Sequence, residues 1–250
     1  MKWRSLEEHA AEPGKRRLRE IYAERKQLIA KYVPQHVQAV HARVVSDLKQ
    51  SGIAERALRA GDVAPEFELP DGHGGLVRSA DLLQRGALVI CFIRGRWCPF
   101  CVGQMEAMDA AYPEIQKLGA SLVAISPQTG HQSFLMADQH HLRFPLLSDS
   151  GNKVARQFGL VYRVAEDQQE IYRRAFINLP SINGDDTWEL PIPAVFIVLS
   201  KAINHGGTQS ECARATSSEP QNLIFFASTD PDYTQRPEPA EIIHSLAQLL

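Results

Sequence analysis

Hydrophobic positions recur with different periods before and after about residue 60, and this divides the chain into two parts. In the first part apolar residues are three and four apart, which predicts two amphipathic helices separated by Pro34. Ser51 and Gly52 end the second helix. The apolar positions are Leu18, Ile21, Tyr22, Leu28, Ile29 and Tyr32 in the first helix and Val37, Val40, Val44 and Leu48 in the second. We therefore expect residues 1–60 to form an N-terminal helical arm, whose apolar stripe packs on the rest of the chain or on the second subunit of a homodimer.

From Gly61 onward, short apolar runs alternate with stretches of helical spacing. The run Ala87–Ile93 is continuous and rich in β-branched residues, which is typical of a central strand buried on both faces. This β-α-β alternation predicts an α/β domain over residues 61–250, with a mixed sheet covered on both sides. The other predicted strands are Phe67–Leu69, Ser121–Ile125, Pro145–Leu147, Ala194–Leu199 and Leu223–Phe226, and the predicted helices are Cys101–Leu118, His131–His141, Asn152–Phe158 and Ala240–Leu250.

One polar stretch, residues 200–222, separates the last two predicted strands and shows little periodicity. A connection of this length between neighbouring strands is unusual. It is interpreted as a surface loop insertion, or as a segment foreign to the protein, and no function is assigned to it.

The composition excludes several classes of protein. With 44% hydrophobic residues the 250-residue chain is an ordinary globular protein, and its net charge of -2 offers no electrostatic reason to bind nucleic acid. The sequence lacks an apolar run near the roughly 20 residues that span a bilayer, and its N-terminus lacks the apolar stretch of a secretory signal. We expect a cytoplasmic location and no membrane partner. Four cysteines are too few for a disulfide-stapled secreted fold.

The chemistry is expected at Cys98 and Cys101, which lie where the central strand passes into a helix. A free thiol, with a pKa of about 8.5, is mostly protonated at neutral pH, whereas the helix N-terminus favours the thiolate. Arg94 and Arg96 add positive charge, and Pro99 suits the first helical turn. The spacing of three places both cysteines on one helix face, so a disulfide between them can form and reopen. Cys98, at the start of the helix, is predicted to be the attacking thiol. Cys101, which is more buried, is predicted to be the resolving thiol that forms the disulfide with Cys98.

Other interpretations of the cysteines are weaker. A zinc site needs a second pair of ligands, but Cys91 lies inside the central strand and Cys212 lies in the polar stretch. Cys91 fits a small core residue, and Cys212 an incidental exposed thiol. No metal site is predicted, and no flavin, haem or nucleotide motif is visible, so no cofactor is expected.

Pro193 is a second candidate, because it runs directly into a predicted strand. Proline at the start of a strand is normal. The functional interpretation is a cis-proline loop that faces the cysteine pair.

The region from about Gly61 to Leu199 resembles the peroxiredoxin family, also known as alkyl hydroperoxide reductase and thiol-specific antioxidant proteins. The resemblance rests on Gly61–Leu69, on a cysteine that follows a buried strand, and on Phe144–Asp149 followed by Val154–Gly159. It implies a thioredoxin-like fold and reduction of hydroperoxides.

The sequence departs from that family at the site. A typical member has a proline and a threonine or serine seven and three residues before its reactive cysteine, where this chain has Cys91 and Gly95. The place of the family's peroxide-polarising arginine falls on Pro193. The segment Trp97–Cys101 is instead similar to the Trp-Cys-x-x-Cys motif of thioredoxins. Arg94 or Arg96, with Trp97 and the backbone N–H groups of the first helical turn, would then activate the substrate.

The predicted function is that of a thiol-dependent peroxidase, in which Cys98 attacks hydrogen peroxide or an organic hydroperoxide and Cys101 resolves the oxidised product. A thioredoxin-like or glutathione-type reductant would recycle the disulfide. Two alternatives stay open: a thiol–disulfide oxidoreductase that acts on protein disulfides, and a non-enzymatic redox sensor.

Overall fold

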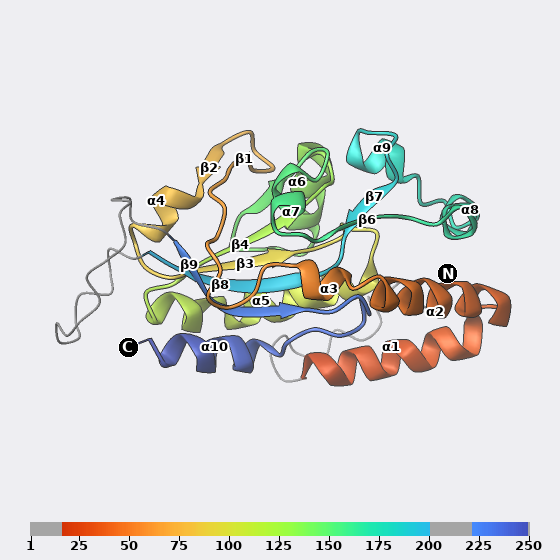
Figure 1. Ribbon diagram of the computed structural model, residues 1–250, viewed down its shortest axis with the longest axis horizontal. Coiled ribbons are helices and arrows are strands. Elements are labelled where there is room, and N and C mark those ends of the chain that lie inside the picture. Colours follow the sequence, from red (N-terminus) through yellow and green to blue (C-terminus); the bar gives the residue numbers. More distant parts are fainter. Residues whose placement is uncertain (1–16, 201–221, 250) are drawn as a thin grey trace.

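A five-stranded mixed sheet forms the centre of the computed structural model, which describes residues 17–200 and 222–249 (Figure 1). The strand order is β5-β4-β3-β8-β9; β3, β4 and β5 are parallel, whereas β8 runs antiparallel to both β3 and β9. The bounds are β3 Leu88–Phe92, β4 Ser121–Ser126, β5 Leu146–Ser148, β8 Ala194–Leu199 and β9 Leu223–Thr229. The predicted central strand is thus confirmed as β3.

Two short hairpins lie outside this sheet. They pair β1 (Glu68–Pro70) with β2 (Leu76–Arg78), and β6 (Val161–Arg163) with β7 (Glu189–Pro191). The helices are α1 Leu18–Tyr32, α2 Gln35–Gln50, α3 Ile53–Arg56, α4 Ser79–Leu83, α5 Pro99–Lys117, α6 Gly130–Gln139, α7 Lys153–Gln157, α8 Glu166–Arg174, α9 Leu179–Asn183 and α10 Pro239–Ala247.

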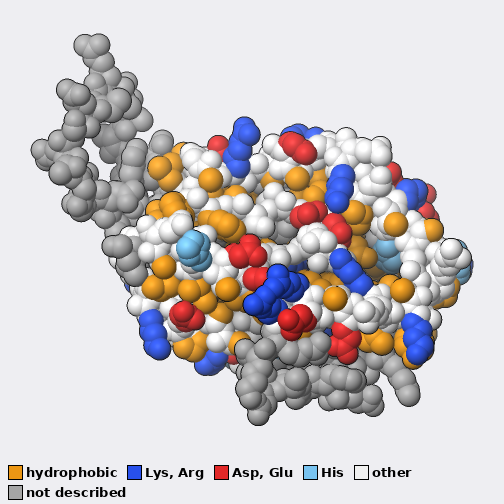
Figure 2. Space-filling model, turned by 90° about the horizontal axis from the view of Figure 1, so that it is seen from below, with side chains coloured by type: hydrophobic (Ala, Val, Ile, Leu, Met, Phe, Trp, Pro, Cys, Tyr) orange, Lys and Arg blue, Asp and Glu red, His pale blue; other side chains and the backbone are white. Residues whose placement is uncertain are grey.

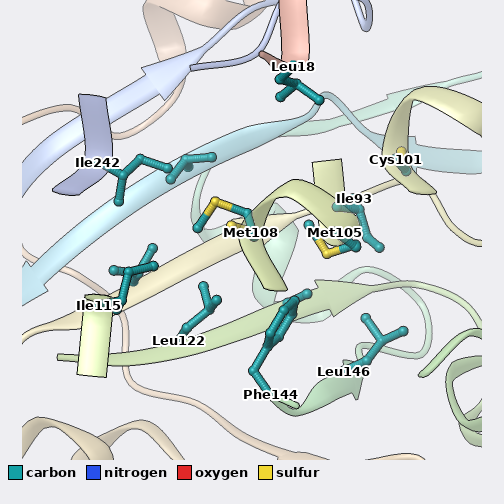
Figure 3. Close-up of a cluster of buried hydrophobic side chains, with 14 of the residues drawn as sticks. Leu18, Ile93, Cys101, Met105, Met108, Ile115, Leu122, Phe144, Leu146 and Ile242 are labelled. Carbon is teal, nitrogen blue, oxygen red and sulfur yellow. The ribbon is translucent and has the colours of Figure 1, made fainter. Parts of the chain in front are cut away.

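The continuous apolar run of β3 is explained by burial on both faces of the sheet. Alternate side chains of a strand point to opposite faces. Val89, Cys91 and Ile93 enter one core cluster, and Leu88, Ile90 and Phe92 enter the other. The first cluster packs α1, α5 and α10 onto the sheet, and Figure 3 shows Cys101 at its edge, beside Met105 and Ile93. The second cluster receives side chains from α3, α4 and α7.

The α1–α2 hairpin packs against the rest of the same chain. On α1, Leu18, Tyr22 and Arg25 are buried, and the Tyr22 hydroxyl donates a hydrogen bond to the carbonyl of Phe100 in α5. The side chain of Arg25 donates to the carbonyl of Pro99. The part of the predicted apolar stripe around Leu18 and Tyr22 is therefore covered in cis, whereas Tyr32 at the end of the helix is exposed. The homodimer and the boundary between arm and domain stay predictions.

The predicted elements are all present, with ends shifted by at most three residues. Sequence patterns missed β2, β6, β7, α3, α4, α8 and α9, because the three strands have only three residues each, α3 has only four, and α4 and α9 have only five. Helix α8 was missed because its sequence, EDQQEIYRR, is dominated by charged and amide side chains. Cys212 and nearly all of the predicted insertion lie outside the described residues.

The surface gives no sign of a single-charge region on the face that carries α1 and α10. Figure 2 shows basic and acidic side chains interspersed there among small groups of hydrophobic ones. Of the helices in the described part of the chain, none is long and apolar enough to cross a membrane.

Candidate active site

The two cysteines lie at the start of α5, directly behind the end of the central strand. Cys98 is the N-cap residue of α5 and Pro99 is its first helical residue. Both thiols are free, and both residues are completely buried. The strand-to-helix placement that the sequence predicts is thus confirmed, and a reactive thiol lies at the positive end of a 19-residue helix.

Arg94 is the side chain that contacts Cys98. Its Nη2 atom donates a hydrogen bond to the Cys98 sulfur over 3.0 Å. The guanidinium is buried, with only 3% of the residue exposed, and its other two nitrogens, Nε and Nη1, lack a partner among the described residues. A buried cation therefore has one N–H group on the sulfur, and the buried Tyr162 hydroxyl also interacts with it.

The charges around the pair separate the two thiols. Burial by itself raises the pKa of Cys98, but a hydrogen bond from the Cys101 thiol and the positive charges of Arg94 and Arg236 outweigh it, so that this pKa lies well below its usual value. Burial raises the pKa of Cys101, and its hydrogen bond to Cys98 and the charge there raise it further, well above its usual value. These shifts favour the thiolate at Cys98 and the protonated thiol at Cys101.

Arg96 is directed away from the sulfur. Its Nη1 donates to Gln132 of α6 over 3.1 Å, and its backbone N–H donates to the side chain of Gln128 over 3.0 Å. Of the two arginines between which the sequence could not decide, Arg94 is the one beside the thiolate.

Arg236 approaches the pair from the loop before α10. Its Nη2 lies 3.9 Å from the Cys101 sulfur, and its Nε donates to Gln104 of α5 over 2.9 Å. Because Arg236 is 135 residues from Cys101 in sequence, helical or strand periodicity could not find it.

Aromatic rings enclose the Arg94 guanidinium. Its central carbon lies 3.9 Å from the centre of the Tyr233 ring and 5.0 Å from that of Trp97. Trp97 also packs edge-on against Tyr172, with ring centres 5.1 Å apart. Neither the Trp97 Nε1 nor the buried Tyr172 hydroxyl has a hydrogen-bond partner in the described residues. Burial raises the pKa of Tyr172 well above its usual value, so this hydroxyl keeps its proton and can donate it.

A cavity of about 880 Å³ opens beside these groups. Arg94, Trp97, Pro99 and Phe100 line its end next to Cys98, and Tyr172 and Tyr233 line it as well. The remaining wall comes mainly from the α1–α2 hairpin and α8. The site thus combines a thiolate, a buried cation and space for a substrate.

Pro193 is buried in the short link between β7 and β8. Because Phe92 pairs with Ala194, Pro193 lies beside the end of β3, from which the segment with Cys98 departs. All peptide bonds in the described residues are trans, however, so the expected cis-proline loop is wrong. The trans form is the common one, since only about 5–6% of X–Pro bonds in folded proteins are cis.

Residues 60–203 match the family model described as the AhpC/TSA family, which covers more than half of the chain. The chain belongs to the AhpC/TSA family. Peroxiredoxin Bcp of Escherichia coli is 33% identical over 103 residues, which are 41% of this chain and 65% of that protein. The chloroplastic Peroxiredoxin Q of Triticum aestivum is 32% identical over 110 residues, which are 44% of this chain and 50% of that protein. The matches thus span between half and about two thirds of the length of these relatives.

The fold agrees with that of solved AhpC/TSA-like structures. The crystal structure of Peroxidoxin BcpB from Mycobacterium tuberculosis superposes with a TM-score of 0.54 and 19% identity, over 77% of this chain and 99% of that one. The thioredoxin-like fold is thereby confirmed. Helices α1 and α2 lie outside the residues that the AhpC/TSA model matches.

The backbone explains why this AhpC/TSA chain has Gly95 where the family pattern has threonine. Gly95 has a φ of 134°, a conformation that residues with side chains rarely adopt. A Cβ atom there would lie 3.0 Å from the Trp97 Nε1 and 3.1 Å from the Gln128 Oε1. A threonine at position 95 would therefore be strained and crowded.

Proposed function

We propose that the protein is a thiol-dependent peroxidase that reduces hydroperoxides through Cys98. One observation carries this proposal: Arg94 donates one N–H group to the Cys98 sulfur while its Nε and Nη1 have no partner in the described residues and the side chain lines a cavity. A hydroperoxide oxygen in the cavity could accept from the same cation that holds the thiolate. Arg94 would thus replace the arginine and the threonine of the usual family pattern.

In the first step the Cys98 thiolate attacks the terminal oxygen of the hydroperoxide. A sulfur–oxygen bond forms, the oxygen–oxygen bond breaks, and the departing alkoxide or hydroxide takes a proton to leave as an alcohol or as water. Negative charge develops on the leaving oxygen, and buried, preorganised donors stabilise such charge more strongly than water does. Arg94, the Tyr172 hydroxyl and the Trp97 N–H are the available donors.

In the second step the Cys101 thiol resolves the sulfenic acid. Its sulfur attacks the Cys98 sulfur, a disulfide forms, the sulfur–oxygen bond breaks, and water leaves with the Cys101 proton. Oxidation of Cys98 removes the negative charge that raises the pKa of Cys101, whereas Arg236 continues to lower it. We propose Arg236 as a positioning residue for this step, acting through Cys101.

A third step returns both cysteines to the reduced state. An external dithiol of the thioredoxin-like or glutathione type reduces the Cys98–Cys101 disulfide. The Trp-Cys-x-x-Cys arrangement, similar to that of thioredoxin, supports a disulfide within one helical turn. A reducing cytoplasmic setting would supply the dithiol.

The burial of Cys98 favours peroxide over a protein disulfide as substrate. The residue is 0% exposed and does not itself line the cavity, although Arg94, Trp97 and Pro99 around it do. A small hydroperoxide needs a much smaller opening between these side chains to reach the sulfur than the disulfide of a folded protein does. We therefore place the peroxidase before the thiol–disulfide oxidoreductase.

Rapid mixing of the reduced protein with hydrogen peroxide, monitored by tryptophan fluorescence, tests the proposal. We expect oxidation much faster than that of free cysteine at the same pH, followed by turnover with dithiothreitol. Oxidation no faster than that of free cysteine would refute peroxidase activity. If such slow oxidation were accompanied by rapid reduction of a protein disulfide, the protein would be a thiol–disulfide oxidoreductase. Oxidation without turnover would identify a redox sensor.

Cysteine variants test the assignment of roles. Cys98→Ser should abolish the reaction, and Cys101→Ser should react once and stop at a sulfenic acid, which dimedone traps and mass spectrometry detects. Cys91→Ala is the matched control, because Cys91 is a buried core residue whose pKa burial raises to about 12. Full peroxide turnover by Cys98→Ser would show that another group attacks.

A further inference from the structure

One short loop carries both of the groups on which the proposed function depends. Residues 93–98 join β3 to α5 and include Arg94 as well as Cys98. The cation holds the thiolate only while the Arg94 Nη2 stays on the Cys98 sulfur, and a displacement of about 1 Å near a reacting group can lower a rate about 100-fold. The groups that hold the backbone of this loop therefore bear on the reactivity of Cys98.

The backbone of the loop is held by the side chain of Gln128, which follows β4. Gln128 is completely buried, and its Oε1 accepts a hydrogen bond from the backbone N–H of Arg96 over 3.0 Å. Because a backbone N–H can only donate, the oxygen of the amide, and not its nitrogen, has to face Arg96. The loop is thus tied to the end of the neighbouring strand β4 by one side-chain acceptor.

A chain of buried hydroxyl groups fixes the orientation of this amide. The Gln128 Nε2 donates to the Ser133 hydroxyl of α6 over 3.3 Å, and the Ser133 hydroxyl lies 3.0 Å from that of Ser148 at the end of β5. The backbone N–H of Gln128 donates to the Ser126 hydroxyl over 3.3 Å. All three serines are at most 3% exposed. A buried polar network of this kind is rigid, so the amide has little freedom to turn.

The amide oxygen of Gln128 also occupies space that a side chain at position 95 would need. Gly95 has a φ of 134°, and a Cβ atom there would lie 3.1 Å from the Gln128 Oε1. The Gly95 carbonyl in turn accepts a hydrogen bond from the backbone N–H of Cys98 over 3.1 Å. Glycine at position 95 and glutamine at position 128 therefore fit each other, and this fit extends to the backbone of Cys98.

We propose that Gln128 is a positioning residue, which holds the loop so that Arg94 stays in contact with the Cys98 sulfur. This inference rests on the proposed peroxidase function and deepens it, because it assigns a role to a residue that lies 32 positions from Arg96 in sequence. The hydrogen bond to the Arg96 backbone and the close fit at Gly95 are the observations that support it. Gln128 acts on the thiolate through the backbone of the loop.

Substitution of Gln128 by leucine tests this role, because leucine cannot accept the hydrogen bond from the Arg96 N–H. The loop should then shift and Arg94 should stabilise the thiolate less, so that the pKa of Cys98 rises by about one unit, a tenfold change in the protonation equilibrium. Alkylation of Cys98 by iodoacetamide, followed against pH by mass spectrometry, measures this without any peroxide turnover. Because the rate follows the thiolate, the inflection of the pH–rate profile should move to higher pH in Gln128→Leu.

Gln132→Leu is the matched control, because Gln132 accepts from the Arg96 side chain instead of the backbone. Its inflection should coincide with that of the unmodified protein. An unshifted inflection in Gln128→Leu, or equal shifts in both variants, would overturn the inference and leave the peroxidase function intact. A shift confined to Gln128→Leu, in a chain that reacts with hydrogen peroxide no faster than free cysteine, would keep the positioning role and refute the peroxidase.

A double-mutant cycle tests whether Gln128 acts through Arg94. In the Arg94→Gln background the guanidinium is absent, so the shift that Gln128→Leu causes should largely disappear. Equal shifts in both backgrounds would show that Gln128 does not act through Arg94 and would overturn the inference. Gln128→Asn keeps the amide but is one methylene group too short to reach the loop, and it repeats every measurement if the leucine variant does not fold.

Discussion

The first turn of α5 and the α1–α2 hairpin lie side by side but are built on different principles. The α5 turn lies at the end of the central strand and is completely buried at both cysteines, with Arg94 and Arg236 in fixed contacts. The hairpin contributes few buried residues, and its second helix buries only Val44. Rigid surroundings hold charges in place, whereas a half-buried apolar face leaves room for a ligand.

The difference indicates a division of labour within one chain. In the proposed function, the core that matches the AhpC/TSA family supplies the thiol chemistry, and the hairpin outside that match lines much of the neighbouring cavity. Tyr22 and Arg25 connect the two, because both donate hydrogen bonds to carbonyls in the first turn of α5. Changes in the core should therefore affect every substrate, whereas changes in the hairpin should affect the cavity and stability.

The largest effect is expected from Arg94→Gln, which acts on the core alone. Removing the cation takes away a buried donor, so the rate of Cys98 oxidation should fall about 100-fold for short and long hydroperoxides alike. The pKa of Cys98 should also rise. Because the rate follows the thiolate, it is flat above that pKa and falls as the pH drops through it, so the inflection of the pH–rate profile should move to higher pH.

Arg96→Gln is the matched control for this prediction, since its side chain is bonded to Gln132 instead of the sulfur. A pH–rate profile of Arg94→Gln that coincides with that of the unmodified protein would contradict the role of Arg94.

An intermediate effect is expected from Arg236→Gln, on the second step. Without this charge the pKa of Cys101 stays higher once Cys98 is oxidised, and a change of one pKa unit corresponds to about a tenfold difference. The sulfenic acid should therefore persist about ten times longer, as measured by trapping with dimedone after rapid mixing. Arg236→Lys should restore part of the rate, and a lysine variant as slow as the glutamine variant would indicate a purely structural role.

The smallest effect is expected where the hairpin joins the core. Tyr22→Phe removes the hydroxyl that donates to the Phe100 carbonyl, so the free energy of unfolding should fall by about 1 kcal/mol. Thermal unfolding should show this as a decrease of about 2–4 °C in Tm. Tyr32→Phe is the control on the same helix, because Tyr32 is 53% exposed. Equal melting temperatures for the two variants would show that this contact does not stabilise the docked hairpin.

Sequence patterns predicted the sheet and the site where the signal is local. The apolar run of β3 and the three-residue spacing of Cys98 and Cys101 are properties of adjacent residues, and both predictions are confirmed. Local patterns failed for α8, whose only buried apolar residue is Tyr172, and for the conformation of Pro193. Local patterns also could not decide whether Arg94 or Arg96 contacts the Cys98 sulfur, because the two arginines lie on one short loop and the backbone conformation decides which way each side chain points.

The sequence by itself determined that a cysteine pair lies at the N-terminus of a helix behind a buried strand, which is the basis for proposing thiol chemistry there. Helix periodicity, strand burial and the helix dipole all act over a few residues, so they can be read along the chain. Only the tertiary structure placed Arg236 near the Cys101 sulfur. It also placed Val37, Val40 and Val45 of α2 in the wall of the cavity that Arg94 lines. These contacts are between residues that lie tens to more than a hundred positions apart in sequence, so they depend on the packing of the whole chain.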